Sequence, residues 1–243
     1  MADKETILNV DVSNETYDSL IPQLFHRIEE QQHSFIVAVN PEKIMKAEQN
    51  ADLRELINAA DYQIPDGIGV LLASRLQGGR ITDRITGVDL MMAIIREASR
   101  QQKRIFLYGA KPGVAEEAKA QLQKDDPNVH VAGVMHGYTD DNDAVIEAIN
   151  QSQADIVFVA KGSPAQEQWI NDNKSRLHAS VFQGVGGSFD VIAGHTKRAP
   201  AWTRKLGLEW LYRLIVEPWR WKRQIVLPRF LLHVVRKRQK KES

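Results

Sequence analysis

Three polar side chains stand at the ends of apolar runs or a few residues beyond them, at positions where they could act on a substrate. Asp66 lies in the sequence Ile-Pro-Asp-Gly, and a carboxylate there could take a proton from an attacking hydroxyl or could cap the next helix. Asn40 precedes a proline, which suits a plain turn before a helix as well as a ligand contact. Gln166 falls in the first turn of a predicted helix, after a dense polar segment. If the apolar runs are parallel strands, these residues border the crevice where such sheets bind ligands.

A second set of residues could bind phosphate or a nucleotide. Arg84 precedes a predicted helix, where its guanidinium fork could hold phosphate oxygens or could simply be solvated. Gly186 and Gly187 belong to a glycine-rich turn that lets a ligand ring lie against bare backbone, and Asp190 could bond a ribose or base edge. Phe189 stands where the dinucleotide fingerprint requires a glycine, which disfavours NAD.

Metal and thiol chemistry find little support in the sequence. The chain has no cysteine, which excludes disulfides, zinc–thiolate sites and thiol nucleophiles, and its seven histidines lack the spacing of a zinc site. Asp141-Asn142-Asp143 matches the DxD pattern that many sugar-nucleotide enzymes use for a metal, but its place before a helical pattern favours an acidic amino-terminal loop. We therefore predict no metal and no cofactor.

Charge is divided unevenly along the chain. Residues 197–243 contain 14 Lys/Arg and 3 Asp/Glu, a balance of +11, whereas residues 1–196 carry a balance of −10. Four of the five tryptophans lie within 200–235 among basic and apolar residues, a mixture that suits the surface of an anionic membrane. The alternative is a basic tail folded onto the acidic body. The apolar content of the tail argues against nucleic-acid binding.

Three arginines of this tail could share one helical face. Arg213 and Arg220 are separated by about two helical turns, and Arg223 follows on nearly the same side, provided that Pro218 only kinks the helix. Pro218 and Pro228 are expected to divide the tail into three short helical pieces. Apolar tail surface that is not covered by lipid could also promote self-association into a homo-oligomer.

The elements that must position these residues alternate regularly. Runs rich in Val, Ile and Phe predict strands at 35–39, 105–108, 129–133, 156–159 and 181–184. Helical patterns predict helices at 17–31, 67–76, 88–101, 114–122, 144–149 and 165–177. This alternation predicts an α/β fold, with Rossmann-like βαβ units around a mostly parallel sheet. We expect an α/β catalytic domain at 1–196 and a basic, tryptophan-rich helical appendage at 197–243.

Eight segments, kept in one order from about residue 36 to 225, resemble the WecG/TagA/CpsF glycosyltransferases, family 26 of that enzyme class. They are VNPEKI, PDGIGV, RITGVDL, FLYGAKPG, HGY, GSPAQEQWI, GVGGSFDVIAG and RAPAWTRKLGLEWLYRLIVEPWRW. The resemblance implies an inverting transfer of N-acetylmannosamine from UDP-ManNAc to undecaprenyl-diphosphate-linked GlcNAc, as in the branch of the family that builds the teichoic-acid linkage unit.

The resemblance also implies roles for individual residues. Asp66 would be the general base, and the remaining roles fall to residues that would line the pocket (Asn40, Arg84, Gln166, Tyr138), hold UDP (Gly186, Gly187, Asp190) or engage diphosphate (Arg213, Arg220, Arg223). Ala38 stands where the family often has threonine, so a hydroxyl contact is missing there.

The sequence also predicts where the protein is located and leaves two other functions open. The first twenty residues carry polar and acidic groups throughout, and no run of about 18 apolar residues occurs, so we expect a cytoplasmic protein held peripherally at the inner face of the cell membrane. One alternative is a related transferase that moves another hexose or a uronic acid to a lipid-linked exopolysaccharide or capsule intermediate. The other is a non-catalytic module that binds nucleotide sugars and membranes.

Overall fold

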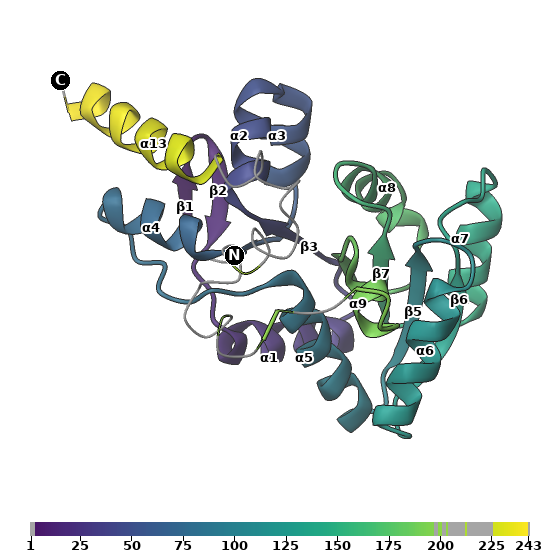
Figure 1. Ribbon diagram of the computed structural model, residues 1–243. Helices are drawn as coiled ribbons and strands as arrows, with labels where there is room; N and C mark the ends of the chain where they lie inside the picture. The colour runs from purple at the N-terminus through teal and green to yellow at the C-terminus, as the bar shows by residue number, and fades with distance from the viewer. Residues whose placement is uncertain (1–2, 197–198, 201–202, 204–211, 213–225, 243) are drawn as a thin grey trace.

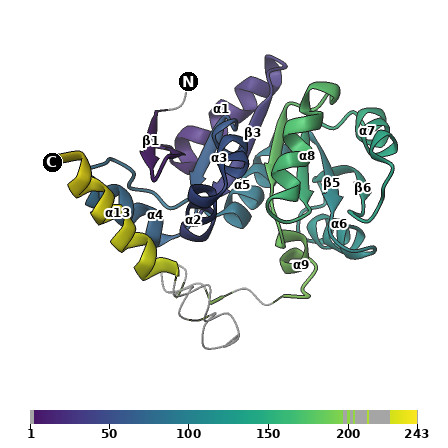
Figure 2. The same cartoon turned by 90° about the horizontal axis from the view of Figure 1, so that it is seen from above.

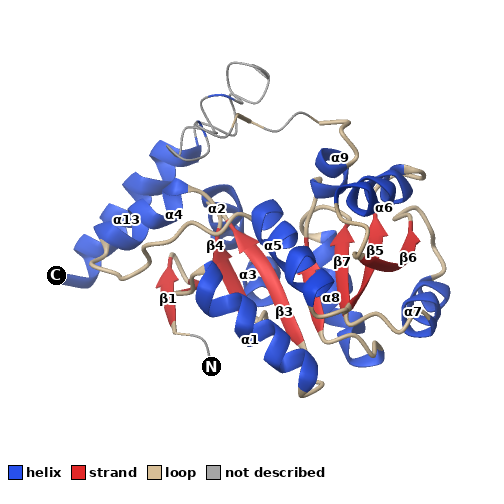
Figure 3. Ribbon diagram, turned by 90° about the horizontal axis from the view of Figure 1, so that it is seen from below, coloured by secondary structure: helices blue, strands red, loops and turns tan. Residues whose placement is uncertain are grey.

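The centre of the molecule is a six-stranded parallel sheet. The computed structural model describes residues 3–196, 199, 200, 203, 212 and 226–242. The strands lie side by side in the order β4-β3-β8-β7-β5-β6, and every neighbouring pair is parallel (Figure 3). Their bounds are β3 Ser34–Val39, β4 Tyr62–Pro65, β5 Arg104–Gly109, β6 His130–Met135, β7 Ile156–Ala160 and β8 Val181–Gly184. The predicted α/β fold is confirmed, and β4 is an additional strand.

Helices cover both faces of the sheet because its strand residues alternate between two cores. Phe35 and Val37 of β3 belong to one buried cluster, and Ile36 between them belongs to the other. The first cluster is covered by α2 Pro41–Gln49, α3 Ala51–Asn58, α4 Ile68–Leu76, α7 Asn142–Gln151 and α8 Ala165–Asn173, which a short 3-10 turn, η1 Lys174–Arg176, follows. The second is covered by α1 Tyr17–Glu29, α5 Gly87–Arg100, α6 Val114–Asp125 and α9 Ser188–Ile192. Figure 1 shows α2, α3 and α8 above the sheet and α1 and α5 below it.

A β-hairpin that the sequence analysis did not predict lies beside β4. Its strands, β1 Lys4–Ile7 and β2 Val10–Ser13, pair antiparallel, and their apolar side chains are buried in the first core. Leu8 and Asn9 form the turn with φ of 49° and 67°, as a two-residue hairpin requires. Ser13 Oγ accepts a hydrogen bond of 3.0 Å from the main-chain nitrogen of Gln63, which joins the hairpin to β4.

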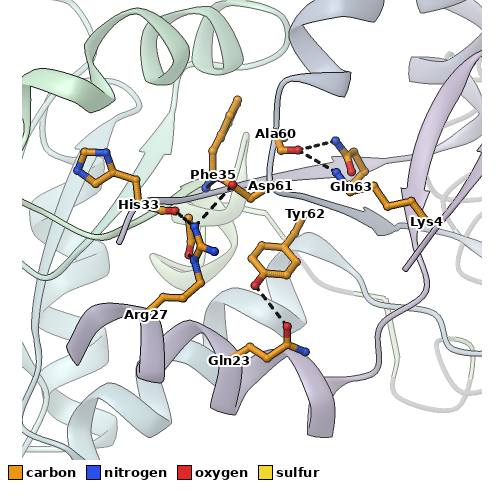
Figure 4. A network of polar contacts seen from close by, with 10 residues as sticks. Lys4, Gln23, Arg27, His33, Phe35, Ala60, Asp61, Tyr62 and Gln63 are labelled. Atoms are coloured by element: carbon orange, nitrogen blue, oxygen red, sulfur yellow. Dashed lines mark hydrogen bonds and ion pairs between the residues drawn. The ribbon is translucent and has the colours of Figure 1, made fainter. Parts of the chain in front are cut away.

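Polar contacts fix the amino ends of β3 and β4 (Figure 4). Asp61, just before β4, accepts a 2.8 Å hydrogen bond from the main-chain nitrogen of Phe35 and lies 3.7 Å from the guanidinium of Arg27. The hydroxyl of Tyr62 donates to Gln23 of α1 at 3.4 Å. These contacts hold the two strands in register at the end of the sheet opposite the one where polar loops gather.

One helix of the basic tail packs onto the body. Helix α13, Val226–Glu242, lies alongside α2 and α4 (Figure 2). Phe230 and Val234 are fully buried in the first core, and Gly69 of α4 lets Leu227 approach so closely that a Cβ at position 69 would lie 2.5 Å from its Cδ1. For this helix the structure shows the alternative that the sequence left open, a basic segment folded onto the body.

Pro228 is one of the two prolines predicted to divide the tail, and the residues directly before α13 lie outside the described residues. Pro228 lies in the first turn of α13, where a main-chain nitrogen has no intrahelical partner, so proline is tolerated there. Pro218, the other predicted break, lies outside the described residues. In the part of the chain that the structure describes, no helix combines the length and the apolar character needed to cross a membrane.

Candidate functional site

A cleft of about 680 Å³ opens at the carboxyl ends of β3, β4 and β8. The chain leaves β3 into α2 on one face of the sheet and leaves β8 towards α9 on the other, so the connections diverge there and leave a crevice. The cleft is lined by six residues that the sequence analysis selected: Asn40, Asp66, Gln166, Gly186, Gly187 and Asp190. The structure therefore brings together residues that are up to 150 positions apart in the chain. We call this space the strand-end cleft.

Asn40 both caps α2 and lines the cleft. Its Oδ1 accepts a 2.9 Å hydrogen bond from the main-chain nitrogen of Lys43, and Pro41 occupies the first helical position. The plain structural role that the sequence allowed is therefore present. It uses the side-chain oxygen and fixes the side chain at the edge of the cleft.

Asp66 stands one residue before the N-cap position of α4. The residue that caps α4 is Gly67, whose φ of 101° lets the chain turn sharply and which has no side chain to cap with. The main-chain nitrogen of Asp66 donates to the carbonyl oxygen of Val39 at 2.8 Å, which extends the pairing of β3 and β4 past the strand ends. This bond sets the half-buried carboxylate at the cleft, where a general base would need to be.

The glycine loop after β8 is held by Gln166. The side-chain oxygen of Gln166 accepts a 2.9 Å hydrogen bond from the main-chain nitrogen of Gly186, which has a φ of 52°. A Cβ at Gly184 would lie 2.6 Å from Gln166 Nε2, so only glycine allows this close approach. Gln166 is 4% exposed, which makes it a residue that positions the loop as well as one that borders the cleft.

A buried ion pair that the sequence did not predict lies beside this loop. Lys43 Nζ of α2 lies 2.7 Å from Glu167 Oε1 of α8, and the two side chains are 10% and 1% exposed. Gln166 Nε2 donates to the same Glu167 oxygen at 3.1 Å. Both charged residues stand in motifs that carried the family resemblance, but no local pattern pairs residues 124 positions apart.

Arg84 lines a neighbouring groove rather than the strand-end cleft. This groove has a volume of about 1110 Å³ and runs between α1 and α5 as far as α4; we call it the helical groove. Thr86 lines both spaces and links them. Its main-chain nitrogen donates to the hydroxyl of Tyr17 at 3.2 Å. Burial raises the pKa of Tyr17 above its usual value, and the carboxylates of Asp89 and Asp66 add to that shift.

The remaining predicted residues lie elsewhere. Tyr138 follows β6 at the far edge of the sheet, is 70% exposed and lines neither space. Arg213, Arg220 and Arg223 lie outside the described residues. Over the described ranges, no three His, Asp or Glu side chains gather as a metal site would require.

Comparison with known proteins decides the family. The profile of the "Glycosyl transferase WecG/TagA/CpsF family" matches residues 5–243, almost the whole chain. This chain belongs to that family. It is similar to the "N-acetylglucosaminyldiphosphoundecaprenol N-acetyl-beta-D-mannosaminyltransferase" of Bacillus subtilis (strain 168), with 39% identity over 98% of this chain and 94% of the relative. A protein with the same name from Bacillus spizizenii (strain ATCC 23059 / NRRL B-14472 / W23) is 38% identical over 86% of this chain and 81% of the relative.

Proposed function

We propose that this chain transfers N-acetylmannosamine from UDP-ManNAc to undecaprenyl-diphosphate-linked GlcNAc, the step that forms the teichoic-acid linkage disaccharide. The observation that carries the proposal is the near-complete match to a relative whose name states this transfer to a lipid-diphosphate acceptor. The strand-end cleft supports it, since a carboxylate, a glycine loop and a second aspartate face one space.

The proposed reaction is a single displacement. A hydroxyl oxygen of the acceptor GlcNAc attacks the anomeric carbon of the donor sugar and forms the new glycosidic bond. The bond from that carbon to the diphosphate breaks, and UDP departs with the electron pair. Asp66 takes the proton of the attacking hydroxyl. Attack opposite the leaving group inverts the anomeric configuration, and one base is sufficient for this chemistry.

The donor nucleotide is proposed to lie against the loop after β8. Gly186 and Gly187 present main chain without side chains, and Asp190 is close enough to border the same surface. A ribose or base edge has hydroxyl and N–H donors that a carboxylate can accept. Gln166 keeps the loop in place through its bond to Gly186.

The leaving UDP needs positive charge, which we propose comes from side chains instead of a metal ion. The proposed sources are Arg84, which lines the helical groove beside the cleft, and the tail residues Arg213, Arg220 and Arg223. We further propose that residues 197–243 bind an anionic membrane surface, where the lipid acceptor resides, which would bring the arginines and the acceptor together. Peripheral attachment at the cytoplasmic face follows from this proposal, and self-association through the tail stays a prediction.

The decisive experiment is a donor panel with a short-chain polyprenyl-diphosphate-GlcNAc acceptor, followed by UDP release and product mass. We expect product from UDP-ManNAc and little from UDP-GlcNAc, UDP-glucose or a UDP-uronic acid. Product from another donor instead would assign a related transferase, and UDP binding without product from any donor would indicate a non-catalytic module. Ala38 lines the cleft, so an Ala38→Thr variant belongs in the same panel as a probe of donor preference.

Two further measurements test the source of positive charge. Turnover should persist in EDTA, and a requirement for a divalent cation would overturn the proposal. Neutralising Arg213, Arg220 and Arg223 together should lower both turnover and binding to anionic vesicles. This triple variant is preferable to deletion of 197–243, because deletion would also remove α13, whose Phe230 and Val234 belong to the core of the body.

A further inference from the structure

We propose that Lys43 contacts the diphosphate of the nucleotide sugar and that Glu167 holds its ammonium group in position for that contact. The inference rests on the proposed donor class and adds a residue to its binding site. It assigns the cleft a cation of its own, on the rigid body of the protein rather than in the tail.

Lys43 is buried although it carries a charge. The residue is only 9% exposed, yet it lines the strand-end cleft. An ammonium group has three donors, and within the described residues Lys43 Nζ makes one hydrogen bond, to Glu167 Oε1. Donors that are removed from bulk water and left without protein acceptors are suited to a ligand that brings its own oxygens.

More acidic than basic side chains line the cleft among the described residues. Three carboxylates line it, from Glu42, Asp66 and Asp190, and they would repel an anionic diphosphate. Among the described lining residues the cations are Lys43 and Lys46 alone. Lys46 is 64% exposed on its side chain and bonds to Glu42 at 2.8 Å, so water screens its charge. Lys43 is therefore the less exposed of the two described cations, and its buried partner Glu167 fixes its position but also offsets its charge until a ligand oxygen reaches the spare donors.

The two carboxylate oxygens of Glu167 are used unequally. Its Oε1 accepts from both Lys43 and Gln166, while its Oε2 is buried without a hydrogen-bond partner in the described part of the chain. An ion pair kept only for stability would be expected to satisfy both oxygens, because a buried carboxylate loses its hydration. Here the arrangement instead links the cation to the loop, since Gln166 also holds Gly186. One carboxylate thus sets the distance between the proposed diphosphate and nucleotide contacts.

In the proposed complex the spare donors of Lys43 bond to diphosphate oxygens, and its charge stabilises the UDP that departs. Lys43 stays protonated throughout, so no proton or electron moves through it. Because the charge of the diphosphate grows as the sugar bond breaks, Lys43 should support kcat as well as binding.

The test uses three variants of the full chain: Lys43→Met, Glu167→Gln and the double variant that carries both. Lys43→Met leaves the buried Glu167 carboxylate unpaired, so its melting temperature should fall. The double variant removes both charges and should recover much of that loss. If Lys43 binds diphosphate, the double variant should still bind UDP about 10- to 100-fold more weakly than wild type, the range for a lost hydrogen bond to a charged group.

Uridine and an exposed lysine serve as controls. Uridine binding, followed by ligand-observed NMR to reach weak affinities, should be unchanged in the double variant because uridine has no phosphate. Lys124→Met, on the exposed face of α6 and away from the cleft, should bind UDP as wild type does. Wild-type UDP affinity in the double variant, or an equal loss of UDP and uridine, would overturn the inference. A wild-type protein that binds no UDP would instead refute the proposed donor class.

Discussion

The strand-end cleft and the helical groove differ both in size and in the groups that they present to a ligand. The groove is the larger, at about 1110 Å³ against about 680 Å³, and it is lined mainly by α1 and α5. Along the helices that line most of the groove the main-chain donors are already bonded, so a ligand there would meet mainly side chains. The cleft lies at the ends of parallel strands, where a carboxylate and bare glycine main chain face one space. Access to main chain and topology, as well as volume, distinguish the two.

Replacing an aspartate should lower kcat far more in the strand-end cleft than in the helical groove. Asp66→Asn should lower kcat for UDP release about 10²- to 10⁴-fold, the usual contribution of a general base. Asp18→Asn in the helical groove should change kcat less than about twofold, since surface substitutions rarely matter. Equal losses in the two variants would remove the distinction between the spaces.

Two arginines of the helical groove offer a narrower comparison. Arg84→Gln should reduce kcat/KM about 10- to 100-fold if its guanidinium engages phosphate, because a hydrogen bond to a charged group contributes about 1.5 to 3 kcal/mol. Arg96→Gln, on the exposed face of α5, should have little effect. Steady-state kinetics with varied acceptor concentration would measure both. If Arg96→Gln proved as damaging as Arg84→Gln, the whole groove would have to be regarded as a binding surface.

A methyl group added at Gly184 should weaken UDP binding moderately. Gly184→Ala would place its Cβ against Gln166 Nε2, so the amide must move and the bond to Gly186 should be lost. UDP affinity should fall about fivefold to tenfold, roughly one hydrogen bond. In a Gln166→Ala background the same alanine meets no amide and should add almost nothing. An undiminished effect in that background would show that Gln166 does not hold the loop.

A small pH dependence of the free energy of unfolding is expected from Tyr17 in the helical groove. Burial, with help from Asp89 and Asp66, raises the pKa of Tyr17, so the folded state keeps its proton more tightly than the unfolded state does. The resulting stability is fully present below the unfolded pKa of about 10 and is lost as the pH rises through the higher folded pKa. Chemical denaturation should show wild type losing more stability than Tyr17→Phe above about pH 10, and parallel curves would contradict the shift.

Much of the fold could be predicted from the sequence because apolar runs and helical patterns alternate. The exceptions have local causes. Strand β4 contains Gln63 and Pro65, which do not suggest a buried strand, but Ser13 and nearby carbonyl oxygens satisfy the side chain of Gln63. The hairpin before α1 has a Leu8-Asn9 turn without glycine, so no turn signal marked it.

The candidate site was predicted only as far as chain order and strand ends allow. Residues after β3, β4 and β8 meet because parallel strands end at one edge of the sheet. Tyr138 also follows a strand, but that strand, β6, lies at the far edge of the sheet. No local sequence pattern predicts the order of the strands in a sheet. The ion pair of Lys43 and Glu167 depends on how α2 packs near α8, so it becomes visible only in three dimensions.

Hydrogen–deuterium exchange with and without saturating UDP would locate the bound nucleotide. If UDP binds in the strand-end cleft, exchange should slow in peptides that cover 184–190 and 40–46 and stay unchanged in 17–29 and 93–101. Protection confined to 17–29 and 93–101 would place the nucleotide in the helical groove instead of the cleft.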